Sequence, residues 1–349
     1  MAELKFLILG DLHYKKKMYA ATAANLDEVL EVANREKVNF CVHLGDFCND
    51  YKGSPEITRK YLDNEYGLDV FGVYGNHELE SAENSMQRVT PLLTNRTNKL
   101  TYGTKSGSIE NGSIGYSYCD TGKFRLIFLD TNYSLTPDGQ YEHNRTKSWG
   151  KPKENTRPDS LGPVQLDWLR SVVLDAADKA LVCVVFSHAS FSGRWRSSPD
   201  NEAVRAIFAE ANAKKEKTVI LAINGHLHSN NEAFTEGGVS YFDCPACINA
   251  LWKMTPYYPY AESDSKKPKY TFDFLDYDEE GNLRGSFKMP YSALSMGANT
   301  LFFESPLFAI ATVSDTGKIK IKGRKTDFSY GISVPHEECY HPEIKDFEN

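Results

Sequence analysis

Five short polar motifs, each placed shortly after an apolar run of strand length, constrain the fold of this chain more than any other feature. The apolar runs cover residues 4–9, 40–44, 70–74, 181–186 and 219–223. The motifs are Asp11-Leu12-His13, Gly45-Asp46, Gly75-Asn76-His77-Glu78, Ser187-His188 and Gly225-His226-Leu227-His228. Short apolar runs bounded by turn residues are typical of buried strands, and the ends of parallel strands converge on one crevice of an open α/β sheet. The sequence therefore predicts one site that is assembled from five loops.

Helical patterns separate these runs and indicate an α/β fold. Apolar residues recur at spacings of three and four between residues 19 and 33, which is the stripe of an amphipathic helix. Further helices are expected over residues 56–66, 166–176 and 204–211, and a further strand over residues 124–130. Alternation of strands and helices implies βαβ units.

Two regions interrupt this alternation. Residues 133–162 are polar and rich in Pro, Asn and Thr, so we expect a long loop insertion that forms one wall of the site. Residues 246–349 contain two hairpin patterns, at 270–289 and 308–322. We predict a catalytic core over residues 1–245, with the C-terminal extension, which is β-rich, packed on the same domain.

Composition narrows the class of protein. The 349 residues carry a formal net charge of −7, which does not suggest a protein that binds along a nucleic-acid backbone. Hydrophobic residues make up 41% of the chain, which suits a packed core. The longest apolar runs are far shorter than the ~20 residues of a membrane span. The run at residues 4–9 leads directly into the first motif, so we interpret it as a strand and not as a signal peptide.

The seven cysteines favour a reduced, cytoplasmic setting. Cys41 and Cys183 lie inside apolar runs, where a free thiol behaves as a small hydrophobe. The segment Cys244-Pro245-Ala246-Cys247 has the spacing of a redox motif, but a single CxxC without a second pair is a weak signal.

Seven side chains in the five motifs are of metal-binding type. They are Asp11, His13, Asp46, Asn76, His188, His226 and His228. If the strand geometry persists, residues two apart, such as Asp11 and His13, point to the same face. Mixed oxygen and imidazole ligands without thiolate suit Mn, Fe, Zn or Co better than calcium or a cysteine-bound zinc. Seven groups suit a pair of ions.

The charge of such a site indicates its substrate. Two divalent ions carry four positive charges, of which two aspartates would remove two. The remaining positive charge favours an anion that gains charge in the transition state, and a two-metal site is a recurrent clamp for in-line displacement at phosphorus. We therefore expect a small-molecule phosphate ester as substrate, and neither a membrane nor a nucleic acid as partner.

In this order, the motifs DxH, GD, GNHE, a single His and GHxH resemble those of the calcineurin-like metallophosphoesterase family, over about residues 4–230. The resemblance implies a four-layer αββα sandwich with a dinuclear metal centre. It implies that one ion is held by Asp11, His13, Asp46 and His228, and the other by Asp46, Asn76, His188 and His226. His77 matches the family's catalytic histidine, which aids the leaving oxygen, and the nucleophile would be a hydroxide that bridges the ions.

Departures from the patterns of particular branches narrow the resemblance. His13 stands where purple acid phosphatases carry a glycine, and Asn49 where they carry a tyrosine. The Asp-Arg-Gly that follows GD in Ser/Thr protein phosphatases is absent. The sequence is more similar to the branch of cyclic-nucleotide phosphodiesterases and nucleotide pyrophosphatases. Asn49 also replaces the acid or histidine with which many relatives orient the catalytic histidine, so we expect His77 to depend on Asp50 or Glu78.

We therefore expect a metal-dependent phosphoric ester hydrolase that cleaves a small phosphodiester or pyrophosphate, with nucleotide-like substrates included. A phosphomonoesterase on the same scaffold is an alternative that the sequence hardly separates from it. A non-catalytic binding module would have lost ligands, and none is missing. Arg194 and Arg196 are candidate contacts for a second phosphate, and His43 is expected in the core or beside the site rather than on a metal.

Overall fold

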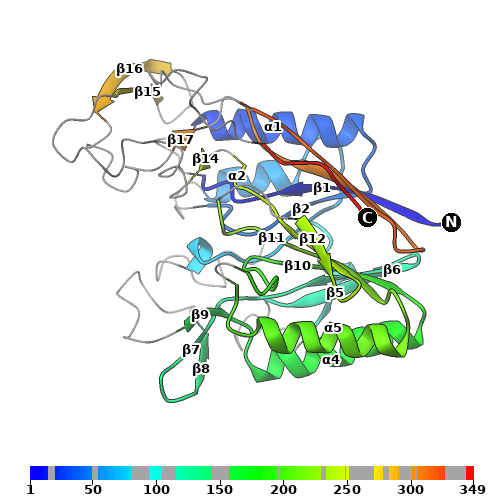
Figure 1. The fold of residues 1–349 in the computed structure, drawn as a ribbon. Helices are drawn as coiled ribbons and strands as arrows, with labels where there is room; N and C mark the ends of the chain where they lie inside the picture. Colours follow the sequence, from blue (N-terminus) through cyan, green and yellow to red (C-terminus); the bar gives the residue numbers. More distant parts are fainter. Residues whose placement is uncertain are drawn as a thin grey trace.

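Two β-sheets packed face to face form the centre of the structure (Figure 1). The computed structural model describes residues 1–14, 20–48, 54–79, 94–103, 115–143, 157–194, 197–228, 233–247, 249–250, 271–277, 283–290, 301–302, 305–326 and 343–349. Within these ranges, the first sheet has the strand order β20-β19-β18-β1-β2-β3, and the second has the order β12-β13-β11-β10-β6-β5-β4.

The first sheet combines the first three strands of the chain with its last three. Its strands are β1 (Glu3–Leu9), β2 (Phe40–His43), β3 (Val70–Gly72), β18 (Ala309–Ser314), β19 (Ile319–Gly323) and β20 (Phe347–Glu348). β1, β2 and β3 run parallel, and β18 pairs antiparallel with β1. β18, β19 and β20 thus lie in the same sheet as the strands that precede the first three motifs.

The second sheet has a parallel centre and antiparallel edges. Its strands are β4 (Thr101–Tyr102), β5 (Ser117–Thr121), β6 (Phe124–Phe128), β10 (Val182–Ser187), β11 (Val219–Asn224), β12 (Ala233–Glu236) and β13 (Val239–Asp243). The parallel strands are β6, β10, β11 and β13, and the edges pair antiparallel through β5 and β12. The carboxyl ends of the parallel strands of a sheet lie at one edge.

Successive side chains of β1 point to opposite faces of the sheet and so belong to two different hydrophobic cores. Phe6 and Ile8 belong to the core between the sheets, whereas Leu7 and Leu9 belong to the core under the first pair of helices. Phe6 stacks on Phe40 with 4.9 Å between ring centroids and meets Phe186 of the opposite sheet edge-on at 5.6 Å. Aromatic packing of this kind stabilises the contact between the sheets beyond the area it buries.

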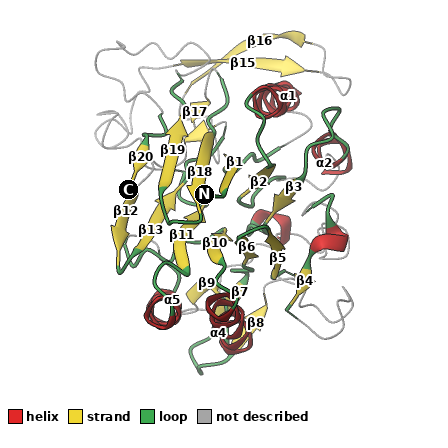
Figure 2. Cartoon of the chain, turned by 90° about the vertical axis from the view of Figure 1, so that its right-hand side faces the viewer, coloured by secondary structure: helices red, strands yellow, loops and turns green. Residues whose placement is uncertain are grey.

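Helices cover the outer face of each sheet (Figure 2). α1 (Ala20–Arg35) and α2 (Ser54–Leu62) cover the first sheet, and α4 (Pro163–Asp178) and α5 (Asn201–Lys214) cover the second. α1 buries Leu26, Val29, Leu30 and Ala33, the apolar stripe that the sequence predicts. The expected four-layer αββα sandwich is confirmed.

The polar insertion at residues 133–162 departs from the loop that we expected. Its described residues form β7 (Tyr133–Leu135), β8 (Tyr141–His143) and β9 (Arg157–Ser160), in the order β8-β7-β9. The carboxylate of Asp200, at the start of α5, accepts hydrogen bonds from the Tyr141 hydroxyl at 2.9 Å and the Leu161 N–H at 2.7 Å. The insertion is therefore partly a sheet, and it is anchored to the second pair of helices.

Both expected C-terminal hairpin patterns form paired strands. β15 (Thr271–Tyr277) pairs antiparallel with β16 (Leu283–Pro290), and β18 pairs with β19. A smaller pair joins β14 (Asn249–Ala250) to β17 (Leu301–Phe302), and short 3₁₀ turns cover His77–Leu79 and Thr97–Lys99. Among the described residues, no helix has both the length and the apolar character that a membrane crossing requires.

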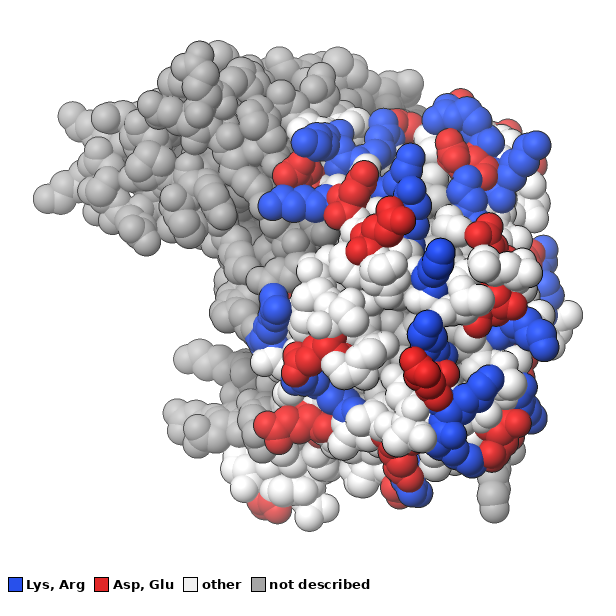
Figure 3. Space-filling view, turned by 45° about the vertical axis from the view of Figure 1, so that its right-hand side comes forward, with Lys and Arg blue, Asp and Glu red and all other residues white. Residues whose placement is uncertain are grey.

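Charged side chains of both signs are mixed on the surface. On the face drawn in Figure 3, Lys and Arg are interspersed with Asp and Glu. Exposed ion pairs such as Arg170 with Glu210 and Lys214 with Asp178 are part of this pattern. A surface whose charges all had one sign would attract a charged polymer over a long range, and this face does not have that character.

Candidate metal centre

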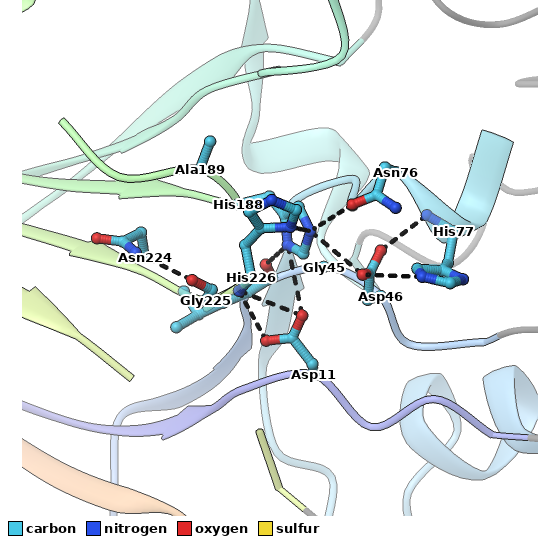
Figure 4. A network of polar contacts seen from close by, with 12 residues as sticks. Asp11, Gly45, Asp46, Asn76, His77, His188, Ala189, Asn224, Gly225 and His226 are labelled. Carbon is cyan, nitrogen blue, oxygen red and sulfur yellow. Dashed lines mark hydrogen bonds and ion pairs between the residues drawn. The ribbon is translucent and has the colours of Figure 1, made fainter. Parts of the chain in front are cut away.

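The seven side chains of metal-binding type lie together, at the carboxyl ends of five strands from both sheets. Figure 4 labels five of them, namely Asp11, Asp46, Asn76, His188 and His226. They follow β1, β2 and β3 in the first sheet and β10 and β11 in the second. The convergence that the strand-end motifs predict is therefore present in the fold.

One group of possible ligands comprises Asp11, His13, Asp46 and His228. One ligand atom from each lies within 4.8 Å of all the others, and all four residues are buried. His13 Nε2 is 2.7 Å from His228 Nε2, which in turn is 3.4 Å from Asp11 Oδ1. Two imidazoles and two carboxylates thus direct their donor atoms at one small volume.

A second group comprises Asp46, His188 and His226. His188 Nε2 lies 3.3 Å from Asp46 Oδ2, 3.0 Å from His226 Nδ1 and 3.1 Å from the side-chain oxygen of Asn76. Nδ1 of His188 donates to the Leu44 carbonyl oxygen at 2.7 Å, so Nε2 is the nitrogen that faces this group and would bind a cation once its proton is displaced. Oxygen and imidazole donors at this spacing fit a borderline divalent cation.

The carboxylate of Asp46 belongs to both groups. Its Oδ2 is 3.3 Å from His188 Nε2 on one side and 3.8 Å from His13 Nε2 on the other. Its Oδ1 accepts a hydrogen bond from the backbone N–H of His77 at 2.8 Å. The arrangement allows one carboxylate to contact two cations, while the same residue fixes the start of the His77 turn.

Burial and neighbouring charges set the ionisation of these groups. Burial works against the charged form of Asp46, but His188 and His77 lower its pKa well below the ordinary value. Burial likewise opposes the charged form of His188, yet the Asp46 carboxylate raises the pKa of this ring to about 10. Burial, together with the nearby His228 and His77, lowers the pKa of His13 to about 3. The pocket therefore holds ionised carboxylates that attract cations.

The backbone that carries the possible ligands is strained rather than extended. His13, Asp46, His226 and His228 have φ values of 51°, 49°, 69° and 47°, in the left-handed region that residues with a side chain rarely adopt. β1 ends at Leu9 and β11 at Asn224, so the expected strand geometry does not persist through the motifs. Asp11 and His13 still belong to one group of possible ligands, whereas His226 and His228 belong to different groups. Strain of this kind concentrates at functional sites, where the surrounding fold imposes it.

Glycines in the motifs allow the loops to approach each other closely. Gly45 has φ 93°, and a Cβ on it would lie 2.6 Å from Nδ1 of His188. A Cβ on Gly75 would lie 2.1 Å from Asp46 Oδ1, and one on Gly225 would lie 2.6 Å from Asp11 Oδ2. Any side chain at these positions would displace a carboxylate or an imidazole.

A buried carboxylate, Glu78, holds two of the loops together. It accepts hydrogen bonds from the backbone N–H groups of Gly75, Asp46, Phe47 and Cys48, at 2.7, 2.9, 2.6 and 3.1 Å. Burial raises the pKa of Glu78 to about 7, helped by the Asp46 charge and opposed by the N–H donors. Glu78 is therefore an anchor for the loops after β2 and β3.

Sequence reasoning missed three acidic or amide residues near the site. Asp130 and Asn132 follow β6, and the Asn132 amide donates to Asp130 Oδ1 at 2.9 Å and to the Tyr74 carbonyl at 3.2 Å. The strand-end rule that found the five motifs could have found these two. Asp159 Oδ2 lies 3.6 Å from His226 Nε2. No local pattern marks Asp159, because it stands in the polar insertion.

Other residues singled out from the sequence have contacts with neighbouring side chains or lie outside the described residues. The Arg194 guanidinium stacks over the Phe234 ring of the edge strand β12, 3.5 Å from its centroid. His43 packs against Phe47 and Tyr61 and accepts a hydrogen bond from the Gly45 N–H at 3.3 Å. Arg196, Asn49 and Asp50 lie outside the described residues.

A sandwich of this type, with acidic and histidine side chains clustered at its strand ends, defines a metal-dependent hydrolase scaffold. A family model for calcineurin-like phosphoesterases matches residues 4–230. The chain belongs to this family of metal-dependent phosphoesterases, which use a dinuclear metal centre. No curated protein matches the sequence at a significant level.

Solved structures share the fold at low sequence identity. A dimetal phosphatase from Danio rerio is 16% identical, with a TM-score of 0.55 over 98% of each chain. The structure of PhoD is 12% identical, with a TM-score of 0.50 over 95% of this chain and 69% of that one. At these identities the likeness concerns the fold alone.

The anchoring role of Glu78 predicts the effect of Glu78→Gln. The side-chain NH₂ of Gln is a donor and cannot accept a hydrogen bond. About two of the four backbone N–H groups therefore lose their acceptor, and each loss costs ~1–3 kcal/mol of stability. We expect urea denaturation of the metal-free protein to show a loss of about 2–6 kcal/mol in the free energy of unfolding. Elemental analysis should show less bound metal per chain.

The matched control is Glu36→Gln, which removes an exposed carboxylate paired with Lys5. An exposed pair contributes about 0–1 kcal/mol, so this variant should keep its stability and its metal. Equal effects of the two substitutions would contradict the anchoring role.

Proposed function

We propose that this protein is a dinuclear metal-dependent phosphoesterase that hydrolyses a small phosphodiester or pyrophosphate, with nucleotide-like compounds as candidate substrates. The observation that carries the proposal is that the two groups of possible ligands share the Asp46 carboxylate. Cations that share a carboxylate are held side by side, which is the arrangement that clamps a phosphoryl group.

The proposed ligand sets follow the two groups. Asp11, His13, Asp46 and His228 hold one ion, and Asp46, Asn76, His188 and His226 hold the other. The 3.1 Å contact between the Asn76 oxygen and His188 Nε2 supports the inclusion of Asn76. Mixed oxygen and imidazole donors without thiolate suit Mn, Fe or Zn.

When bound, such ions supply Lewis acidity and an activated water for attack at phosphorus. The chain itself positions the groups around that reaction. His77 lies at the rim, with 15% of its side chain exposed, and its Nε2 is 3.8 Å from Asp46 Oδ2. Its ring meets His13 edge-on, with 4.7 Å between centroids. In the proposal, His77 donates a proton to the leaving oxygen, which is the role of a general acid.

Departures from the motifs of two phosphatase branches argue against a purple acid phosphatase and a Ser/Thr protein phosphatase, and to that extent favour the diester. His13 occupies a position at which purple acid phosphatases carry a glycine, and it faces His228 in the first ligand group. The Asp-Arg-Gly of Ser/Thr protein phosphatases is absent after Gly45-Asp46, where the N–H groups of Phe47 and Cys48 bond to Glu78.

Two substitutions test the roles of Asp46 and His77. Asp46→Asn removes the shared charge, so both the metal content and the rate should fall. His77→Ala should lower the rate by about 10²–10⁴-fold, which is the usual contribution of a general acid, with the metal content retained. Elemental analysis and initial rates on bis-p-nitrophenyl phosphate measure both effects. Asp63→Asn, at an exposed carboxylate, is the control for lost charge. Loss of metal in the His77 variant would show that His77 is a ligand.

A comparison of two chromogenic esters tests the class of substrate. After reconstitution with Mn²⁺, we expect kcat/KM for bis-p-nitrophenyl phosphate to exceed that for p-nitrophenyl phosphate by about 10-fold or more, a barrier difference of ~1.4 kcal/mol. The chelated protein is the control and should hydrolyse neither ester. The opposite preference would identify a phosphomonoesterase, and no hydrolysis by metal-loaded protein would favour a binding module.

A further inference from the structure

The carboxylate of Asp159 lies on the outer side of His226. Asp159 Oδ2 is 3.6 Å from His226 Nε2, whereas Nδ1 of the same ring is 3.0 Å from His188 Nε2 inside the second ligand group. The two nitrogens lie at different edges of the imidazole ring. A carboxylate beside Nε2 therefore contacts the ring and not an ion held at Nδ1, and Asp159 belongs to neither ligand group among the described residues.

The pairing of its strand and the contacts of Leu161 hold Asp159 in this position. It stands on β9, which pairs with β7 through a register irregularity between Tyr133 and Leu135. Its φ of 65° is in the left-handed region. Irregularities of this kind re-aim a side chain and are frequent beside active sites. Two residues later, the Leu161 N–H donates to Asp200 and its carbonyl accepts from Gln165, which fixes the end of the strand.

The charge on Asp159 suits a partner that carries a proton. The side chain is 24% exposed and that of His226 is 19% exposed, so the pair lies at the mouth of the site. At 3.6 Å the contact is longer than a hydrogen bond. The attraction is therefore electrostatic, and it favours the tautomer of His226 with its proton on Nε2.

We propose that Asp159 is a positioning residue for the metal centre. By favouring the proton on Nε2 of His226, it leaves the Nδ1 lone pair free to bind the ion in the second ligand group. A carboxylate behind a metal-bound histidine fixes its tautomer and raises its basicity, and its loss costs 10–100-fold in metal affinity in known sites. This inference rests on the proposed function, because that proposal makes His226 a ligand.

The proposal also gives the insertion at residues 133–162 a second role. The strand that returns this insertion to the core places an acid 3.6 Å from His226, which the proposal assigns to one ion alone. Changes at Asp159 should therefore affect the two ions unequally. A residue that served only to stabilise the fold would affect both ions through the stability of the protein.

Calorimetric titration of the metal-free full-length protein with Mn²⁺ tests this. Wild type should bind two ions. In Asp159→Ala, one binding event should weaken by about 10–100-fold while the other stays within about 2-fold. Asp159→Asn keeps an oxygen that can face Nε2, so it should recover part of the affinity. The matched control is Asp138→Asn, an exposed acid in the turn of the same insertion, which should bind both ions as wild type does.

Thermal unfolding of the metal-free variants and the visible spectrum of the Co²⁺-loaded proteins complete the test. The proposal predicts an unfolding temperature close to wild type and a changed d–d band for Asp159→Ala. Two binding events of wild-type affinity in that variant would overturn the proposal. Equal weakening of both events with a lower unfolding temperature would also overturn it, because that result describes a structural residue. A wild-type protein that binds a single ion would contradict the dinuclear centre itself, and this inference with it.

Discussion

The candidate site depends on two buried carboxylates. They accept hydrogen bonds from backbone N–H groups of loops that belong to both sheets. Glu78 holds the loops after β2 and β3 within the first sheet, through four N–H groups. Asp11 ties the first sheet to the second, because its carboxylate accepts the N–H of His226 at 2.9 Å. A buried N–H left without an acceptor destabilises the fold, so these contacts fix the separation of the loops. The separation of the loops in turn sets the positions of the side chains that could bind metal.

The rigidity of the sandwich permits the strained backbone at the site. Four of the residues in the ligand groups have positive φ, and three glycines in the same loops leave no space for a side chain. Such conformations cost of order 1–3 kcal/mol each and persist only where the surroundings determine them. The aromatic packing between the sheets and the helices on both outer faces provide those surroundings. The stable parts of the fold thus maintain a site that its local sequence alone would not form.

Much of this architecture follows from the sequence, because its signals are local. The strand-end motifs, the stripe of α1 and the C-terminal hairpins depend on residues close together in the chain. Asp11 and His13 fall in one group of possible ligands, as their spacing indicates, although β1 ends at Leu9 and the strand geometry does not persist through the motif. The strands of the polar insertion and the position of Asp159 depend on contacts with Asp200 and His226, which no local pattern encodes. The stacking of Arg194 on Phe234 likewise depends on a contact between residues far apart in the sequence.

The central claim is that one carboxylate, that of Asp46, is shared by two metal ions. Anomalous X-ray diffraction from crystals of the Mn²⁺-loaded protein, collected on both sides of the manganese absorption edge, tests it most directly. The account predicts two anomalous peaks, one among Asp11, His13 and His228 and the other among Asn76, His188 and His226, with Asp46 bound to both. A single peak, or two peaks of which only one contacts Asp46, would contradict it.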